Sequence, residues 1–293
     1  MHYSTRMTFF LFLLLTFGPL PQERPSSCSN CPVWNMPQKP FRVYGNTYYV
    51  GTHGLGSVLI TSPSGHILID GALPESVPQI TGNIRSLGFR VEDIKLIVNS
   101  HVHFDHAGGI AELQKLSGAR VAASPWAANV MKKGIVPPDD PQFGNIPIAR
   151  VARVATIKDG ETLQEGTLTI TAHLTPGHTP GGTSWTWRSC ENSRCLNLVY
   201  SDSLTAVSAD NFFFTHSKVY PNAIADFERS FTFLDKTRCD ILITPHPGFS
   251  NLWQRLESRT ADPDALIDTT ACHKLADSSR AGLKTRIATE ADQ

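Results

Sequence analysis

The chain lacks a surplus of charge of either sign, because its 26 Lys and Arg residues balance its 26 Asp and Glu residues. It also lacks any run of like charges that would form a basic arm or an acidic tail. We therefore expect no nucleic-acid partner, since that class of protein presents a concentrated basic surface. With 41% hydrophobic and 18% charged residues, the composition is globular and excludes disordered, collagen-like and coiled-coil chains.

Long apolar runs are missing as well, because no segment reaches the roughly 20 apolar residues that a membrane-spanning helix needs. At the N-terminus, Arg6 precedes a short apolar stretch over residues 8–17, which a Gly-Pro step at 18–19 interrupts. A basic start, a short apolar core and a breaker are typical of a secretory signal, with a buried helix or a membrane anchor as the alternative. We expect a signal peptide over residues 1–24, with an uncertain cut site, and a single domain over residues 25–293.

Cysteine is sparse, and none of the six cysteines lies inside a histidine cluster. They fall in near pairs along the chain: Cys28 with Cys31, Cys190 with Cys195, and Cys239 with Cys272. Structural disulfides fit an exported protein, whereas a four-cysteine zinc site would need a second C-x-x-C pair that the chain does not have. Metal binding or redox chemistry at the first pair is the alternative, and six cysteines allow many pairings, so the connectivity stays open at this point.

Turn signals and hydrophobic spacing predict two β-rich blocks, each followed by helices. Hairpins are expected around residues 45–46 and 62–65, and short strands buried on both faces over 94–100 and 240–246. Further strands are predicted over 120–124, 159–177, 182–189 and 196–203, and helices over 76–89, 109–118, 126–134, 223–237 and from Ala265 into the tail. This order favours an α/β fold in which two sheets pack face to face with helices outside. Residues 134–152 form one long loop of the kind that often covers a binding site.

The stretch NSHVHFDHAGG, residues 99–109, places three histidines and an aspartate directly after a predicted buried strand. Alternate residues of an extended chain share a side, so we expect His101, His103 and Asp105 to point one way. His106 can face a neighbouring point if the chain bends, and the flexible residues 107–109 permit such a bend. Imidazole and carboxylate ligands suit Zn²⁺, so two histidines would serve one metal and the Asp-His step a second. A histidine-rich turn without function is the alternative.

Two metals need more ligands, and two distant histidines are the best placed. His178 lies in the turn TPGHTPGG after a strand, and His246 ends the strand DILITPH. Active groups gather at strand ends, where loops converge over a rigid sheet. His53, in GTHGLG, is a candidate for the border of the site, whereas His173 lies inside its strand and is expected to be an ordinary packed or surface residue.

Four stretches, HVHFDHAGG, TPGHTPGGTSWTW, YSDSLTAVSAD and DILITPHPGFSNLW, resemble the metallo-β-lactamases, specifically subclass B3, from about Phe41 to the C-terminal helix. The first stretch alone marks only the superfamily, which also holds glyoxalase II, lactonases and nucleases. The resemblance implies a four-layer αβ/βα sandwich with two Zn²⁺ per chain between the sheets. It also supports pairing Cys190 with Cys195 and Cys239 with Cys272, as in secreted members that carry disulfides.

Carried over to matching positions, the resemblance implies one zinc held by His101, His103 and His178 and a second held by Asp105, His106 and His246. It implies that Ser203 and Thr205 contact the substrate carboxylate or the metal-bound water, and that Gln142 and Phe143 of the long loop line the pocket. In glyoxalases and nucleases an aspartate in a similar D-[ST]-L context bridges both metals. The surrounding DSLTAVSAD matches the lactamase pattern instead, so we leave Asp202 outside the ligand set.

The resemblance therefore implies a periplasmic or secreted, monomeric β-lactamase that confers antibiotic resistance. It would hydrolyse the lactam amide of penicillins, cephalosporins and carbapenems through a zinc-bound hydroxide, with Asp105 as a ligand that also orients the nucleophile. Its partner would be the small-molecule β-lactam, with no nucleic acid and no stable membrane anchor after signal removal. Two alternatives stand: another hydrolase of the same fold, such as a lactonase or a thioester hydrolase, and a secreted zinc- or sugar-binding module without catalysis.

Overall fold

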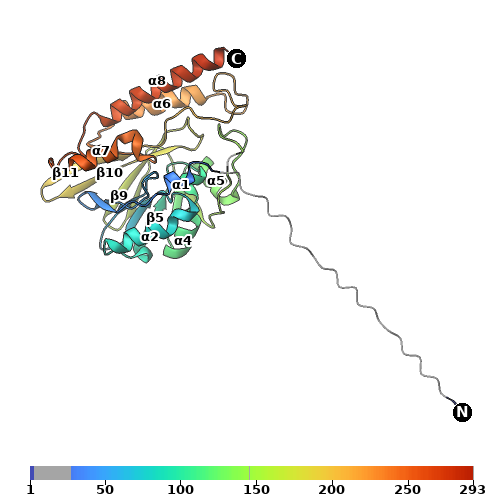
Figure 1. The fold of residues 1–293 in the computed structure, drawn as a ribbon, viewed down its shortest axis with the longest axis horizontal. Helices are drawn as coiled ribbons and strands as arrows, with labels where there is room; N and C mark the ends of the chain where they lie inside the picture. The colour runs from blue at the N-terminus through green and yellow to red at the C-terminus, as the bar shows by residue number, and fades with distance from the viewer. Residues whose placement is uncertain (3–27, 145, 293) are drawn as a thin grey trace.

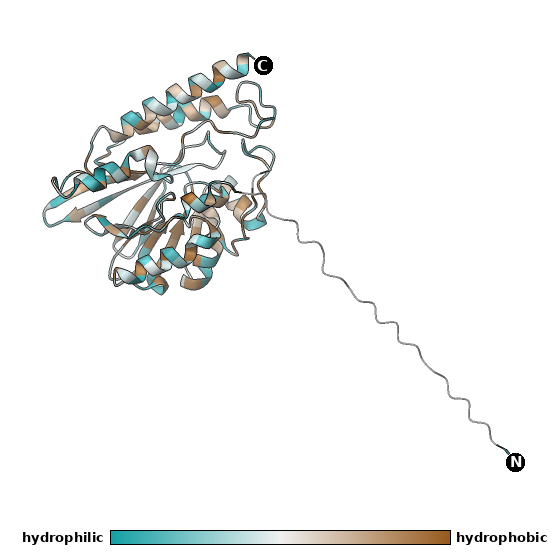
Figure 2. Ribbon diagram, in the orientation of Figure 1, coloured by the Kyte–Doolittle hydropathy of each residue, from teal (hydrophilic) through white to brown (hydrophobic). Residues whose placement is uncertain are grey.

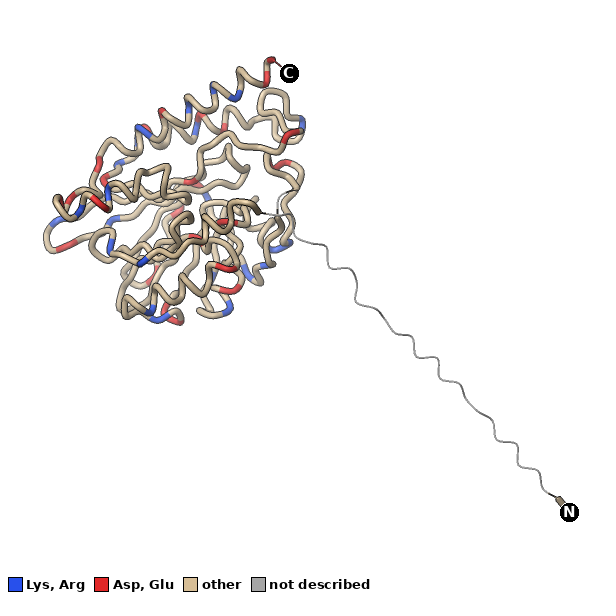
Figure 3. The backbone as a smooth tube through the Cα atoms, in the orientation of Figure 1, with Lys and Arg blue, Asp and Glu red and all other residues tan. Residues whose placement is uncertain are grey.

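The protein is described by a computed structural model that covers residues 1–2, 28–144 and 146–292 (Figure 1). The predicted signal peptide, residues 1–24, lies outside this part of the chain except for its first two residues. Within the described residues, no helix combines the length and the apolar character that crossing a membrane requires. Figure 3 shows acidic and basic residues interspersed along the described chain, which agrees with the balanced composition.

The first sheet contains seven strands in chain order: β1 (Phe41–Tyr44), β2 (Thr47–Tyr49), β3 (Val58–Ile60), β4 (His66–Ile69), β5 (Ile94–Val98), β6 (Arg120–Ala123) and β7 (Val154–Thr156). The strands β1 to β4 pair antiparallel, as the two predicted hairpins require. From β4 to β7 the pairing is parallel, which needs crossover connections. These crossovers carry η1 (Pro74–Ser76), α2 (Val77–Ser86), η2 (Val91–Asp93), α3 (Phe104–Ala107), α4 (Ile110–Ser117) and α5 (Pro125–Lys133).

The second sheet contains β8 (Thr162–Glu165), β9 (Leu168–Leu174), β10 (Thr183–Glu191), β11 (Arg194–Tyr200) and β12 (Ile241–Ile243). The strands β8 to β11 pair antiparallel, and β12 joins β11 in parallel after the crossover helix α6 (Ala223–Lys236). After β12 come η3 (Pro247–Ser250), α7 (Leu252–Ser258) and α8 (Ala271–Ala291), and α8 lies along α6 (Figure 1).

Three apolar clusters separate four layers, because alternate residues of each strand face opposite ways. On β4, Ile67 and Ile69 pack between the two sheets, whereas Leu68 packs under α2, α4 and α5. On β11, Tyr200 faces the first sheet and Val199 meets α6 and α8. Figure 2 shows apolar strands enclosed by helices of mixed hydropathy. The predicted fold, an αβ/βα sandwich, is thereby confirmed.

The C-terminal helix begins later than the sequence indicates. It was expected from Ala265, but α8 starts at Ala271. Asp268 holds the preceding turn, because its backbone N–H donates to Asp240 and its carboxylate accepts a hydrogen bond from the N–H of Thr270 at 2.9 Å. A side chain that bonds the backbone two residues on competes with helix formation, so the helix begins only after this turn.

All six cysteines are paired in the structure, as Cys28–Cys31, Cys190–Cys195 and Cys239–Cys272. The second disulfide joins directly opposed residues of β10 and β11, and the third ties the start of β12 to α8. The first closes a tight turn at the start of the described domain, next to α1 (Cys31–Trp34). The pairing leaves no thiol for the alternative of a cysteine metal site.

Candidate metal centre

The histidine-rich turn bends two residues earlier than the sequence predicts, at Phe104 instead of His106. His103 itself is extended, with a ψ of 151°, and the candidate ligand atoms of His101 and His103 lie within 4.8 Å of one another, so the two side chains point to the same place. Asp105 and His106 instead belong to the single helical turn α3. The expectation that Asp105 continues the extended alternation is therefore wrong. The early bend separates the two histidines from the Asp-His step and directs them to two neighbouring points.

The glycines after this turn serve close packing, not the flexibility that the sequence suggests. Gly108 and Gly109 adopt right-handed helical angles that any residue can take. A Cβ on Gly109 would lie 2.3 Å from the carbonyl oxygen of Gly71, and one on Gly108 would lie 2.6 Å from Cδ of Pro74. The loop after β4 thus presses directly on the ligand turn, and the N–H of Gly71 donates to the carbonyl of His106 at 2.8 Å.

The first ligand group consists of His101, His103 and His178, whose candidate ligand atoms lie within 4.8 Å of one another in a buried position. Nδ1 of His101 donates to Oδ1 of Asp202 at 2.7 Å, and Nδ1 of His178 donates to the backbone carbonyl of Thr205 at 2.8 Å. These bonds leave Nε2 of both rings as lone-pair donors to a metal. Nε2 of His101 is buried and has no hydrogen-bond partner among the described residues.

His103 is oriented the other way. Its Nε2 lies 3.1 Å from Oδ1 of Asp140, so its Nδ1 faces the group. The side-chain amide nitrogen of Gln142 lies 3.3 Å from this Nδ1 and 3.4 Å from Nε2 of His178, which shows that the two lone pairs converge. Fixing one ring nitrogen by a carboxylate or carbonyl is how proteins orient histidine ligands. All three rings are held in this way.

Burial keeps His101 and His178 of the first group neutral. It lowers the pKa of His178 to about 3 and holds the pKa of His101 well below its usual range, with the neighbouring histidines adding to the effect. A histidine must be neutral to ligate a metal. At neutral pH His101 and His178 are therefore neutral imidazoles, and the three histidines form a donor set suited to Zn²⁺.

The second ligand group consists of Asp105, His106 and His246. Oδ2 of Asp105 lies 3.3 Å from Nε2 of each histidine. Burial alone would raise the pKa of Asp105, but the charge of His106 and hydrogen bonds from both rings hold it well below its usual range. Burial opposes the protonation of His106, yet Asp105 and Asp70 raise its pKa. A divalent cation fits this group, since it would replace the shared protons beside the carboxylate.

The two groups are neighbours, because the ring centroids of His101 and His106 lie 4.4 Å apart. His246 comes from the end of β12 in the other sheet, and its Nδ1 is 3.2 Å from the carbonyl of Gly54. The ligands thus enter from both sheets at the edge where parallel strands end. This is the arrangement that a two-metal site requires.

Two buried aspartates support the ligand turn without joining it. Asp202 touches His101 and belongs to neither ligand group, in line with its exclusion above. It fits because a Cβ on Gly182 would lie 2.2 Å from its Oδ2. Asp70 accepts hydrogen bonds from the N–H and hydroxyl of Ser100 at 2.7 Å each and from the Tyr200 hydroxyl at 2.8 Å. Its φ of 59° is a left-handed value, a strain typical of functional loops.

Sequence reasoning missed Asp70 and Asp140. Asp70 follows β4 without any motif around it. Asp140 lies in the long loop over the site, where the acidic pair at residues 139–140 was an available signal. The carboxylate of Asp140 is buried and reaches a ligand 37 positions away in sequence.

A pocket of about 300 Å³ opens over both groups. The predicted residues Gln142, Ser203 and Thr205 line it. Phe143 is not among the lining residues, and it is 49% exposed. A substrate contact by Phe143 stays a prediction. Asn30 and Trp34, which no motif marked, also line the pocket, as do Val207 and Phe249, which lie inside two of the four stretches but were not singled out.

The remaining histidines have structural surroundings. His53, a candidate for the border of the site, stacks on Trp253 with ring centroids 4.7 Å apart and is not among the residues that line the pocket. Only the carbonyl of its neighbour, Gly54, reaches a ligand. His173 stacks on Phe233 at 4.4 Å, as expected of a packed residue.

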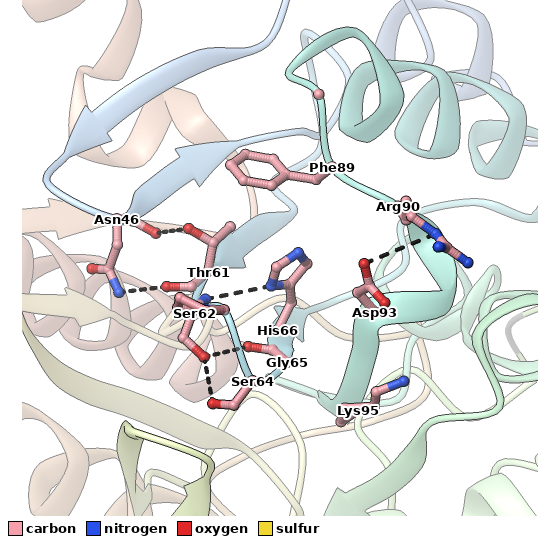
Figure 4. Close-up of a pocket in the computed structure, with 12 residues that line it drawn as sticks. Asn46, Thr61, Ser62, Ser64, Gly65, His66, Phe89, Arg90, Asp93 and Lys95 are labelled. Carbon is pink, nitrogen blue, oxygen red and sulfur yellow. Dashed lines mark hydrogen bonds and ion pairs between the residues drawn. The ribbon is translucent and has the colours of Figure 1, made fainter.

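A larger cavity, about 580 Å³, is shown in Figure 4, and it shares no lining residue with the pocket over the metal groups. It surrounds His66, the first residue of β4, whereas the metal ligands follow the last residues of the parallel strand β5. Its polar groups bond one another: the N–H of Ser62 donates to Nδ1 of His66 at 3.4 Å, and Arg90 pairs with Asp93 at 4.0 Å. Size alone therefore does not identify the site, which is defined by the converging ligands in the smaller pocket.

With this geometry described, known proteins can be compared. The family model of the metallo-beta-lactamase superfamily matches residues 56–190. The structure of the Rm3 metallo-beta-lactamase is 53% identical, with a TM-score of 0.89 over 90% of this chain and 99% of that one. MEM-A1, a subclass B3 metallo-beta-lactamase from a soil metagenome library, is 50% identical, with a TM-score of 0.87 over 88% of this chain and 99% of that one. A hydroxyacylglutathione hydrolase of Methylobacterium nodulans is 33% identical over 105 residues, which are 35% of this chain and only 32% of that relative.

The chain belongs to the metallo-β-lactamase superfamily. Within that class, the structural relatives include enzymes described as subclass B3, which confirms the resemblance of the four sequence stretches. The absence of a cysteine from both ligand groups agrees with this placement.

Proposed function

We propose that the chain is a zinc-dependent β-lactamase that hydrolyses the amide of penicillins, cephalosporins and carbapenems and so confers antibiotic resistance. The observation that carries the proposal is the pair of adjacent three-residue ligand groups that open into one pocket. They occur in a chain similar to subclass B3 enzymes over about nine-tenths of its length. Two Zn²⁺ held there would polarise the lactam carbonyl and acidify water near neutral pH.

The residues divide the work by charge. His101, His103 and His178 bring no negative charge, so a metal in the first group keeps its full attraction for a carbonyl oxygen. Asp105 stays ionised at neutral pH because of its low pKa. In addition to its role as a ligand, Asp105 would accept a hydrogen bond from the attacking water and so orient it.

The substrate contacts follow from the walls of the pocket. Ser203 and Thr205 present hydroxyl groups on the side of the first group, where the backbone of Thr205 already bonds His178. These two hydroxyl groups would donate hydrogen bonds to the substrate carboxylate. Gln142 lies over the first group, and its amide is placed to hydrogen-bond a bound substrate.

We also propose that residues 25–293 form one exported, monomeric domain released from a signal peptide at residues 1–24. Three disulfides support an oxidising compartment such as the periplasm. Mass spectrometry of the protein from a periplasmic fraction tests this, since an intact residue 1 would contradict it.

The decisive experiment is steady-state hydrolysis of one member of each of the three β-lactam classes, with and without a chelator. Turnover that disappears with the chelator and returns with Zn²⁺ supports the proposal. A second candidate is a thioester or lactone hydrolase, favoured by the partial match to the hydroxyacylglutathione hydrolase. Turnover of a glutathione thioester or a homoserine lactone in place of all three β-lactams would establish that candidate instead.

A further inference from the structure

One wall of the pocket comes from the N-terminal segment, residues 28–36, far in sequence from every ligand. Asn30 and Trp34 of this segment line the pocket. The Trp34 ring lies against the His246 ring, with centroids 5.1 Å apart, and against Phe104 at 6.4 Å. The segment therefore stands beside the second ligand group, whereas Ser203 and Thr205 stand beside the first.

The two ends of this segment are held by different means. The Trp34 carbonyl accepts hydrogen bonds from the Thr52 hydroxyl at 2.6 Å and from the N–H of Gly54 at 3.1 Å. Gly54 must be a glycine for this contact, because a Cβ there would lie 2.5 Å from Cα of Trp34. The side-chain oxygen of Asn35 adds a bond from Ser76 at 2.7 Å.

The other end, residues 28–30, makes no hydrogen bond to the body of the domain among the described residues. The carbonyl of Asn30 accepts only the N–H of Trp34, at 2.9 Å, from within the segment. What fastens this end is the Cys28–Cys31 disulfide, whose two cysteines pack against the apolar cluster under the first sheet. The disulfide thus closes the turn that presents the exposed Asn30 side chain to the pocket.

The chemistry of this wall fits one part of a β-lactam. With the lactam carbonyl over the metal groups and the carboxylate at Ser203 and Thr205, the acylamino substituent is the part left without a partner. A carboxamide such as that of Asn30 offers both a donor and an acceptor to an amide group. The Trp34 ring beside it offers an apolar surface to the attached side chain.

We propose that Asn30 is a specificity-determining residue that hydrogen-bonds the acylamino substituent of the substrate, and that the Cys28–Cys31 disulfide is what positions it. The inference rests on the β-lactamase function proposed above. It assigns the disulfide a role in substrate choice that the two other disulfides do not share, since neither lies at the pocket.

The test compares benzylpenicillin with 6-aminopenicillanic acid, which has the same bicyclic nucleus but no acyl group. For Asn30→Ala we expect a KM about tenfold higher for benzylpenicillin, the loss of roughly one hydrogen bond, with kcat unchanged. The KM for 6-aminopenicillanic acid stays the same. Asn30→Gln, which keeps the carboxamide, recovers part of the loss.

The paired variant Cys28→Ser with Cys31→Ser should give the same substrate-selective rise in KM with an unchanged zinc content. Cys190→Ser with Cys195→Ser is the matched control, because it removes a disulfide away from the pocket, and its KM ratio should stay that of the wild type. Equal changes for both substrates, or none in Asn30→Ala, would overturn the inference. If the wild type hydrolyses neither compound, the proposed function itself has failed, which is a distinct result.

Discussion

Two regions of the described chain bring metal-ligand side chains together, and they differ in what already occupies those side chains. One is the pocket with its two buried groups, and the other is the exposed cluster of Asp235, His273 and Asp277 on α6 and α8. In the exposed cluster both nitrogens of His273 face carboxylates, at 2.8 and 3.5 Å. Arg280 also pairs with both aspartates, at 2.7 and 3.0 Å.

In the pocket, by contrast, the lone pair of His101 at Nε2 is buried without a partner, and the outer nitrogens of the rings are fixed by Asp202, Asp140 and Thr205. Proximity of ligand-type residues is thus common to both regions. Only the pocket leaves desolvated lone pairs that a cation would satisfy. The exposed cluster already contains its cation, the guanidinium of Arg280.

Chelation should have the largest effect. We expect EDTA to abolish β-lactam hydrolysis and added Zn²⁺ to restore it, because the neutral imidazoles do no chemistry without the metal. Hydrolysis is followed by the loss of lactam absorbance, and bound zinc by atomic emission. Turnover that persists after the zinc has been removed would disprove the metal mechanism.

Replacing the carboxylate of the second group should come next. Asp105→Ala should keep the zinc of the first group, lose affinity for the second and lower kcat by about 10²-fold or more. Metal analysis and kcat on the same preparation check this. Asp277→Ala is the matched control, since it removes a carboxylate from the exposed cluster and should leave both values unchanged. Near-normal turnover in Asp105→Ala would contradict the role given to this residue.

Loosening a ligand without removing it should have a smaller effect. Asp202→Asn replaces the acceptor for Nδ1 of His101 with an amide, so the ring loses its fixed tautomer. Changes to such supporting partners typically cost 10–100-fold in metal affinity or activity. Titration with a zinc chelator measures the affinity, with Asp235→Asn as the control. Unchanged affinity in Asp202→Asn would mean that the packing alone orients His101.

Much of this contrast could be predicted from the sequence, because its signals are local. The turn at residues 99–109 carries four ligands within six positions, and strand ends marked His178 and His246. The hairpins and crossovers also follow from periodicity. Two kinds of feature could not be predicted. Contacts between residues far apart in sequence leave no local pattern, as for Asp202 and His101, which are 101 positions apart. Very short elements show no helical period, as for α1, which has only four residues.

The pH dependence of the metal-free protein sharpens the comparison further. The pKa of His178 falls from 6.5 when exposed to about 3 in the fold, mainly through burial. Between pH 6.5 and 3, His178 therefore binds a proton in the unfolded chain but not in the folded one. Its contribution to stability is complete above pH 6.5 and is lost as the pH falls toward 3. In His178→Gln the decline in the free energy of unfolding over this range should be less steep. Denaturant titrations of both chelated proteins measure it, and equal slopes would contradict the assignment.

The smallest effect is expected in the exposed cluster. His273→Ala removes its central residue, yet zinc content and kcat should equal those of the wild type, because Arg280 still neutralises both aspartates. The free energy of unfolding should change by no more than about 0.5 kcal/mol, as for other exposed positions. His246→Ala is the counterpart in the pocket and should lose the second metal. If His273→Ala lost zinc as well, the exposed cluster would be a true metal site. Buried nitrogen lone pairs without a hydrogen-bond partner would then no longer distinguish the metal site from the exposed cluster.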